Sequence, residues 1–324
     1  MTTVAITGAA AVTSLGATPS MWRRFDAGEH AAGAVVGPSV DALPAAVATR
    51  AARVERLGQL VLAAGGGALH AAGLATIDGP PRAAFGVVVG TAFGCFLTNA
   101  AYERRFVDGG PAAASPRLFA ATVSNAAAGE LAIAYRLGGP SVTVTAGAAS
   151  GLLALGHAAD LVCAGRADAV VAGGADALGD ELVRWASVAG LAPPAAASEA
   201  AAFLVLEDPA SAGRRGVSVL GTIEGFAAAF GPDASSVDAA VTRALDDAGI
   251  AASAIAVIAG ASSGASSRAQ QVETSTRFGQ TFGAGGALAL LAALRAAAPG
   301  AFVLAVDACP TGHRAALVAR AGEP

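Results

Sequence analysis

Charged and aromatic side chains are scarce in this chain of 324 residues. Asp, Glu, Lys and Arg together make up 14% of the residues, and Phe, Trp and Tyr only 5%. Acidic residues outnumber basic ones by 24 to 20, and the basic residues form no long run. Because neutralising phosphates requires clustered Lys and Arg, we expect no nucleic-acid partner.

Cysteine is rare as well. Cys95, Cys163 and Cys309 are odd in number and far apart in the sequence. This usage indicates reduced thiols rather than a disulfide framework or a zinc site. No signal peptide is visible at the beginning of the sequence, so the chain is expected to be cytoplasmic. We expect neither a metal nor a cofactor.

Hydrophobic residues, by contrast, make up 54% of the chain, and the mean hydropathy is +0.59. This composition excludes a disordered chain and supplies enough apolar surface for a large core. A membrane-spanning helix needs roughly 20 continuous apolar residues. The best candidate, residues 283–298, is interrupted by Arg295 and owes its hydropathy mainly to Ala and Gly. We predict that it is a buried helix and that the protein has no membrane partner.

Short apolar runs alternate with Ala-rich stretches of helical length. Strands apolar on both faces and separated by helices indicate an α/β fold with buried sheets. A strand, a turn and a Gly-rich helix occur at both 142–164 and 256–294, which indicates an internal duplication. The runs at 202–206 and 217–220 are predicted to pair as a hairpin. The predicted strands are residues 4–7, 86–90, 142–145, 169–173, 202–206, 217–220, 256–259 and 301–306.

Two local motifs resemble known kinds of functional site, a dinucleotide-binding turn and a nucleophile elbow. Residues 6–16 begin like a dinucleotide-binding turn, but Ala11 or Val12 stands at the middle glycine position and no acidic partner follows. Residues 139–151 predict an elbow, a strand that turns sharply into a helix and can present a nucleophile at its tip. The tip is Gly147, which has no side chain. Ser150 is the nearest nucleophile, and a serine at this place is more often a helix cap.

The order of the motifs resembles the β-ketoacyl synthase branch of the thiolase superfamily, and the resemblance covers nearly the whole chain. It implies a thiolase-like α/β fold in which a duplicated αβ unit gives a layered αβαβα architecture. The halves implied are residues 1–212, which contain the elbow, and residues 213–324, together forming one compact unit. The segments that carry the resemblance are residues 6–16, 119–125 (FAATVSN), 138–141 (GGPS), 165–176 (GRADAVVAGGAD), 279–286 (GQTFGAGG) and 312–318 (GHRAALV).

Members of this branch use a Cys nucleophile and two His residues for decarboxylative condensation. The matching positions here are Gly147, Ser262 and Gln280, and the family's lysine matches Ser275. The resemblance therefore implies that the catalytic side chains are absent. This pattern is most similar to a chain-length factor, the inactive ketosynthase-like subunit of a type II polyketide synthase. Those subunits usually carry Gln where this chain has Gly147, and this chain is shorter, with length missing around 179–199, 226–237 and 295–302.

The resemblance implies a non-catalytic subunit that forms a heterodimer with an active ketosynthase. It would shape the acyl tunnel during polyketide or fatty-acid-like chain elongation, and it would meet an acyl carrier protein through the complex. Condensation would take place on the partner subunit of this acyltransferase complex. The expected tunnel or interface residues are Phe119, Thr122, Asn125, Ala126, Val142 and Val144.

Two alternatives stay open. One is a homodimeric decarboxylase or acyltransferase of the same fold with an altered nucleophile, for which Ser150, Cys309 or His313 are the candidates. The other is a scaffold that holds a carrier protein without influencing chain length.

Overall fold

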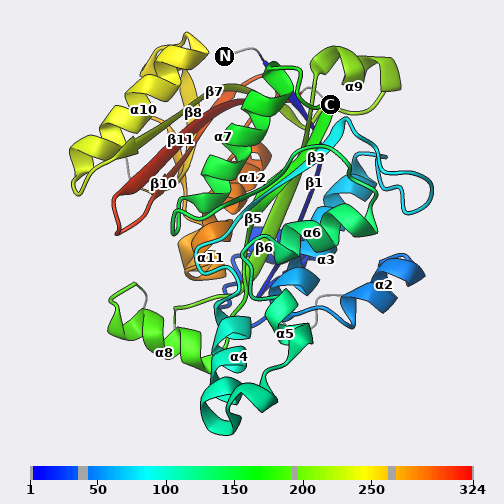
Figure 1. Cartoon of the computed structure of the whole chain (residues 1–324). Coiled ribbons are helices and arrows are strands. Elements are labelled where there is room, and N and C mark those ends of the chain that lie inside the picture. Colours follow the sequence, from blue (N-terminus) through cyan, green and yellow to red (C-terminus); the bar gives the residue numbers. More distant parts are fainter. Residues whose placement is uncertain (1–2, 36–42, 192–195, 262–267, 323–324) are drawn as a thin grey trace.

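The computed structural model describes residues 3–35, 43–191, 196–261 and 268–322, and these residues form a mixed α/β fold around one large sheet (Figure 1). The larger elements of the first half are β1 (Val4–Thr13), α3 (Arg56–Ala71), β3 (Phe85–Gly90), α4 (Phe96–Gly109), α6 (Ala126–Ala134), β4 (Ser141–Val144), α7 (Ser150–Cys163), β5 (Ala169–Asp176) and β6 (Ala200–Glu207). Those of the second half are β7 (Gly221–Phe230), α10 (Ala234–Ala248), β8 (Ile255–Gly260), β9 (Gln270–Val272), α12 (Gly285–Ala296), β10 (Phe302–Ala308) and β11 (His313–Ala321). Shorter elements connect them: β2 (Gly16–Ala17), α1 (Ser20–Asp26), α2 (Ala45–Ala51), η2 (Pro111–Ala113), α5 (Pro116–Ala120), α8 (Asp180–Val188), α9 (Pro209–Arg215), η3 (Ala252–Ala254), α11 (Ser275–Phe278) and η4 (Phe282–Ala284).

The sheet is built from two copies of one plan. Its strand order is β4-β3-β5-β6-β1-β7-β11-β10-β8-β9, with β2 paired to β1. Leaving out the short β2, each half contributes five strands. Outward from the pair β1–β7, the first half runs β1, β6, β5, β3, β4 and the second half runs β7, β11, β10, β8, β9, so both follow the same order of first, fifth, fourth, second and third strand. In both halves the two inner pairings are antiparallel and the two outer pairings are parallel. The predicted duplication is therefore confirmed, but the second predicted unit begins one strand early, because β8 corresponds to β3 and the counterpart of β4 is β9. The boundary between residues 212 and 213 falls within α9 and stays a prediction.

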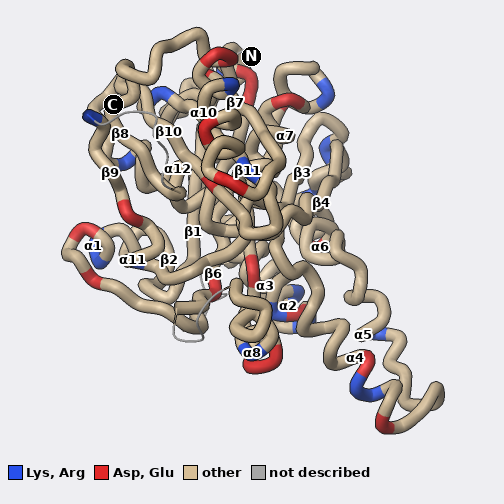
Figure 2. Tube along the Cα trace, turned by 90° about the vertical axis from the view of Figure 1, so that its left-hand side faces the viewer, with Lys and Arg blue, Asp and Glu red and all other residues tan. Residues whose placement is uncertain are grey.

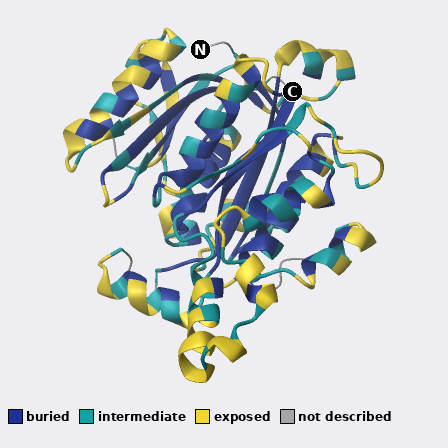
Figure 3. Ribbon diagram, in the orientation of Figure 1, coloured by how far each residue is buried: buried dark blue, intermediate teal, exposed yellow. Residues whose placement is uncertain are grey.

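The helices complete five layers. The two central helices, α7 and α12, contact each other between the two halves of the sheet, while α3 and α6 cover one outer face and α10 covers the other (Figure 1). Figure 3 shows this centre as buried, and α12 confirms the predicted buried helix at residues 283–298. Among the helices that the structure describes, none combines the length and apolarity needed to cross a membrane.

One local prediction is wrong, and the sequence's objection to a dinucleotide-binding turn is upheld. Residues 6–16 form no such turn, because β1 continues straight through Gly8. A Cβ at Gly8 would stand 2.6 Å from the backbone nitrogen of Ala72, so the glycine allows α3 to pack closely on the strand. The hairpin of residues 202–206 with 217–220 is also absent, because the intervening residues form α9 and both β6 and β7 pair with β1 instead. The Asp208 side chain caps α9 by accepting a hydrogen bond from the Ser211 amide at 2.9 Å.

Candidate functional site

The elbow, residues 145–150, lies between β4 and α7, and its own serine is fully engaged. Gly147 has a φ of +60°, in the left-handed region that favours glycine. The buried Ser150 hydroxyl accepts a hydrogen bond from the Ala146 amide at 2.8 Å. It also lies 3.0 Å from the Thr91 carbonyl and 2.6 Å from the Gly147 carbonyl, either of which accepts its proton. Ser150 therefore holds the turn together and is not poised as a nucleophile.

The tip of the elbow is filled from the other half of the chain. Cys309 is buried in the turn between β10 and β11, and its sulfur lies where a side chain on residue 147 would begin. A Cβ on Gly147 would overlap Cys309 Sγ and stand 3.4 Å from Cys309 Cβ. The elbow and the β10–β11 turn thus meet at one point, and the thiol occupies the volume that Gly147 leaves empty.

A short chain of polar atoms leads away from this thiol. Cys309 Sγ lies 3.0 Å from Thr311 Oγ1, which lies 3.4 Å from His313 Nδ1. The His313 ring packs edge-on against Phe230, with 5.2 Å between the ring centroids. The turn itself is closed by the Cys309 amide, which donates to the His313 carbonyl at 2.8 Å, and by the Arg314 guanidinium, which donates to the Cys309 carbonyl. Cys309 and His313, separate candidates in the sequence, are therefore linked through Thr311, for which the sequence offered no signal.

A cavity of about 180 Å³ lies beside the elbow. Ala148 and Ala308 form part of its wall, and Ser275 and Gln280 line it as well. These are the two residues that the sequence resemblance assigned to the positions of the family's lysine and second histidine, and that assignment stays a prediction. The Gln280 backbone is fixed by two hydrogen bonds, its amide donating to residue 196 at 2.7 Å and its carbonyl accepting from residue 198 at 2.9 Å. Ser262, matched to the first histidine, lies outside the described residues.

Asp307 is the ionisable group of this cavity, and sequence reasoning missed it. Its Oδ1 accepts a hydrogen bond from the Ala308 amide at 2.9 Å, whereas its Oδ2 is buried without a partner. Burial raises the pKa of the carboxyl group to about 7, against the opposing effect of the amides of Ala308 and Gly286. The group can therefore gain or lose a proton near neutral pH.

A second buried carboxyl group organises the loops around the elbow. Asp176, at the end of β5, accepts hydrogen bonds from Thr91 Oγ1 at 2.7 Å and from the Gly283 amide at 2.7 Å. It also accepts from the amides of Ala92 at 2.9 Å and Phe93 at 3.0 Å. Desolvation raises its pKa, and these hydrogen bonds act in the opposite direction. The Thr91 carbonyl in turn contacts the Ser150 hydroxyl. Asp176 therefore positions the elbow indirectly, through Thr91.

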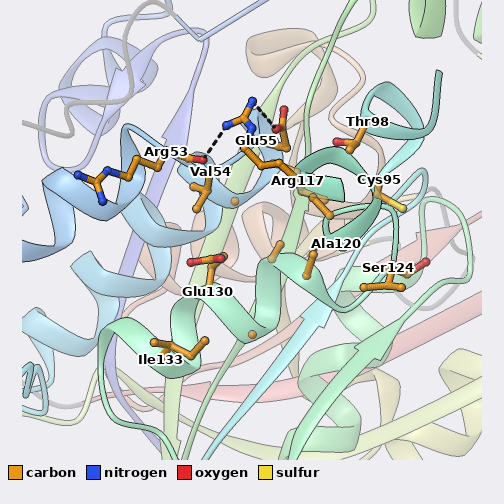
Figure 4. A pocket seen from close by; sticks show the side chains of 17 residues that line it. Arg53, Val54, Glu55, Cys95, Thr98, Arg117, Ala120, Ser124, Glu130 and Ile133 are labelled. Carbon is orange, nitrogen blue, oxygen red and sulfur yellow. Dashed lines mark hydrogen bonds and ion pairs between the residues drawn. The ribbon is translucent and has the colours of Figure 1, made fainter. Parts of the chain in front are cut away.

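A larger cavity, of about 340 Å³, opens between the start of α3, the start of α4, α5 and α6 (Figure 4). Ala126 is the one expected tunnel residue among its lining residues. Arg117 lies at its rim between Glu55 Oε1, 3.8 Å away, and the Arg53 carbonyl, 3.4 Å away. Glu130, on the wall, pairs with an arginine of α2 at 2.6 Å. The lining is thus mostly apolar, but it includes the charged residues Arg117 and Glu130, each of which lies near an oppositely charged side chain.

The other expected interface residues lie near this cavity or at the sheet edge. Phe119 is 62% exposed and packs against Tyr102 with 5.7 Å between the ring centroids. The Thr122 hydroxyl donates to the Phe119 carbonyl at 2.7 Å, and Asn125 is exposed at the beginning of α6. The remaining two, Val142 and Val144, are half-buried on β4, which is the terminal strand of the sheet.

Exposed apolar side chains gather on the same helices. We call this set the α4–α6 face, because its members lie on α4, α5 and α6 and on the segment between α5 and α6. In Figure 2, α4 and α5 project from the body of the molecule. The residues of the face are Phe106, Val107, Phe119, Val123 and Ile133.

Comparison with known proteins identifies the family. The family model "Beta-ketoacyl synthase, N-terminal domain" matches residues 31–203. Nodulation protein E of Rhizobium meliloti (strain 1021) is 31% identical over 283 residues, which cover 76% of this chain and 69% of that protein. A 3-oxoacyl-[acyl-carrier-protein] synthase 2 of the same strain is 30% identical over 200 residues, 54% of this chain and 47% of the synthase. The chain therefore belongs to the β-ketoacyl synthase family.

Solved structures agree with the fold. A β-ketoacyl synthase from Burkholderia phymatum STM815 superposes with a TM-score of 0.85 at 21% identity and covers 100% of both chains. The ishigamide ketosynthase/chain length factor gives 0.83 at 23% identity, over 99% of this chain and 100% of that chain. A type II polyketide synthase acyl-carrier protein in complex with its ketosynthase bound to the hexaketide gives 0.81 at 20% identity, over 98% and 99%. The predicted thiolase-like fold is confirmed.

Proposed function

We propose that this chain is a chain-length-factor-type subunit, which pairs with an active ketosynthase and shapes its acyl tunnel while the partner carries out the condensation. The observation that carries the proposal is the tip of the elbow. Gly147 has no side chain, and the sulfur of Cys309 occupies the space in which one would begin. A nucleophile at the family position is therefore both absent and sterically blocked.

The cavity beside the elbow supports the same proposal. Condensation in this family depends on imidazole groups that assist loss of carbon dioxide. Gln280 and Ser275, which the resemblance assigns to the family's histidine and lysine positions, both line the cavity, and no histidine of the described residues lines it. An amide cannot take up or release a proton near neutral pH as an imidazole does. On this assignment, the chain lacks the nucleophilic cysteine, the second histidine and the lysine at the same time.

The proposed docking surface combines β4 with the α4–α6 face. A strand at the end of a sheet offers unpaired backbone groups to a second chain, and the exposed apolar side chains of the α4–α6 face, of which α6 contacts β4, favour association. On this proposal the 340 Å³ cavity forms part of the wall of the tunnel, bordered by Ala126 and by the segment from Phe119 to Asn125. A permanent heterodimer of this kind buries more than ~2,000 Å².

The comparisons are consistent with this role and with its carrier protein. One structural neighbour is named as a ketosynthase/chain length factor, and another contains an acyl-carrier protein bound to its ketosynthase. Of the sequence relatives, in contrast, one is named nodulation protein E and another 3-oxoacyl-[acyl-carrier-protein] synthase 2. The altered catalytic positions are therefore the reason to favour a partner subunit over a synthase.

The decisive experiment is co-expression with a ketosynthase that retains its Cys and both His residues, encoded in the same gene neighbourhood. We expect a heterodimer on size-exclusion chromatography and elongation of a carrier-bound chain that requires the partner's Cys. A well-behaved homodimer that ignores the ketosynthase and turns over malonyl-carrier protein by itself would show that the proposal is wrong.

A further inference from the structure

We propose that a cavity between α3, β1 and the end of α6 binds a monocarboxylic acid with an apolar body, whose carboxylate accepts hydrogen bonds from Tyr135 and His70. The cavity has a volume of about 530 Å³, within the range of ~300–1,000 Å³ that is typical of small-molecule sites. Among the described residues, it shares no lining residue with the cavity beside the elbow or with the 340 Å³ cavity. The inference therefore does not rest on the proposed pairing with a ketosynthase.

Small side chains of α3 and β1 create the space. Ala63, Gly66 and Gly67 line the cavity from α3, and residues 9–11 line it from β1. The helix packs closely on the strand, since a Cβ at Gly67 would stand only 2.8 Å from the Cβ of Ala10. Larger side chains at these positions would fill the volume. The wall is therefore suited to an apolar body, although small residues by themselves explain only the close packing of the helix on the strand.

Tyr135 provides the polar group that points to a ligand. It directly follows α6 and is 1% exposed, and its hydroxyl oxygen is buried without a hydrogen-bond partner among the described residues. The oxygen lies over Gly66, where a Cβ would overlap it, and both residues line the cavity. A buried hydroxyl that stays unpaired destabilises the folded state. A ligand that places an acceptor at this end of the cavity would remove that cost.

The donors available define the polarity of the ligand. Desolvation raises the pKa of Tyr135 to about 12, so the hydroxyl keeps its proton at neutral pH and can donate it to a hydrogen bond. His70 lines the same cavity one helical turn after Gly66 and is exposed. An imidazole has a ring N–H to donate in either protonation state. None of the described lining residues is acidic. A carboxylate has two oxygens that can accept from both donors, and it meets no negative charge on this wall.

The first test is calorimetric titration of the purified full chain with octanoate and with methyl octanoate, which has the same apolar body but no charge. We expect both to bind and octanoate to bind more tightly. Ala63→Leu places a larger side chain in the cavity and should abolish binding of both probes, with a thermal melt to show that the variant is folded. Ala132→Leu replaces a half-buried alanine of α6 outside the cavity and should keep both affinities.

Three outcomes of this titration overturn the proposal. The first is that octanoate does not bind to the wild-type chain. The second is that methyl octanoate binds at least as tightly as octanoate, which would exclude the carboxylate as the recognised group. The third is that folded Ala63→Leu binds octanoate with wild-type affinity, which would place the ligand elsewhere.

Tyr135→Phe separates ligand binding from a structural role, because it removes only the unpaired oxygen. Octanoate should bind roughly 10- to 100-fold more weakly, whereas the melting temperature of the free variant should be unchanged or higher, since no hydrogen bond within the protein is lost. His70→Ala should also weaken octanoate binding. Tyr102→Phe and His30→Ala lie outside the cavity and are the matched controls, with wild-type affinity expected.

Two results for the Tyr135→Phe variant contradict the assignment of the hydroxyl. Wild-type affinity for octanoate would show that the oxygen does not contact the ligand. A lower melting temperature of the free variant would show that the hydroxyl already has a partner within the protein.

Discussion

Cys309 and Gly147 share one small volume: the thiol of the first fills the space that the second leaves by having no side chain. The two residues come from opposite halves of the duplicated fold. The Cys309 side chain fits in its position because Gly147 has no Cβ. A cysteine at position 147 would therefore force the Cys309 sulfur to move, because the new Cβ would overlap it.

This relationship predicts a disulfide. In Gly147→Cys, the two Cβ atoms would be 3.4 Å apart, close to the range of about 3.5–4.5 Å found in disulfides. We expect the variant to oxidise readily to a 147–309 disulfide, visible as the loss of two thiols on titration and as a cross-linked peptide after digestion. Gly147→Cys combined with Cys309→Ser is the control. Two titratable thiols at these positions after mild oxidation would contradict the arrangement.

Restoring the family's nucleophile should not restore condensation. The double variant Gly147→Cys with Cys309→Ala supplies a thiol at the elbow without the steric overlap, since only the Cβ of residue 309 stays nearby, at 3.4 Å, but Gln280 offers no imidazole to assist decarboxylation. We expect release of carbon dioxide from malonyl-carrier protein to stay at the background rate in the absence of a partner. Partner-free turnover by this variant would mean that the His positions are dispensable, and the proposed function would lose its main support.

The stability of the protein should depend on pH through Asp307. Its pKa is raised to about 7 in the folded protein, whereas an unfolded Asp titrates at about 4. Between these two values the folded state binds more protons than the unfolded state, so stability falls as pH rises through this window, by roughly 1.4 kcal/mol per pH unit at most. Asp307→Asn should remove this part of the dependence. Denaturant unfolding of both proteins at pH 4 to 8 measures it, and parallel curves would contradict the assignment.

Asp176 should be essential for the fold around the elbow. Asp176→Ala leaves the Thr91 hydroxyl and the amides of Ala92, Phe93 and Gly283 without their acceptor. We expect a loss of about 3–5 kcal/mol in the free energy of unfolding, as for other buried charged groups that lose a partner. The exposed Asp238→Ala, on α10, should change stability by less than about 0.5 kcal/mol. Equal losses in both variants would show that Asp176 has no special role.

Product length should respond to the segment between α5 and α6. Phe119→Ala should lengthen the carrier-bound chains made by the reconstituted pair, and Thr122→Phe should shorten them, as measured by mass spectrometry. Because Phe119 is 62% exposed in the isolated chain, its truncation should weaken association with the ketosynthase without lowering the melting temperature of the subunit. Leu220→Ala, an exposed apolar residue between α9 and β7, is the control. An unchanged length distribution in both variants, with the heterodimer intact, excludes this segment as a determinant of length.

The Ala-rich composition limited what the sequence could predict about individual strands. β11 has the sequence HRAALVARA and β7 contains the run FAAAF, and neither was predicted as a strand, because alanine favours helices in isolation. In the fold both strands are held by pairing on two sides, β7 by β1 and β11, and β11 by β7 and β10. Tertiary pairing overrides the local preference there.

The sequence by itself determined the α/β class, the duplicated plan, the elbow and the empty tip at Gly147, because these depend on local patterns of apolar, small and turn-forming residues. The tertiary structure alone decided what occupies that tip. Cys309, Thr311 and His313 lie at alternate positions of one turn, but their meeting with Gly147 depends on how the two halves pack around α7 and α12. Sequence spacing carries no information about such a contact, since it depends on the sum of many long-range packing interactions.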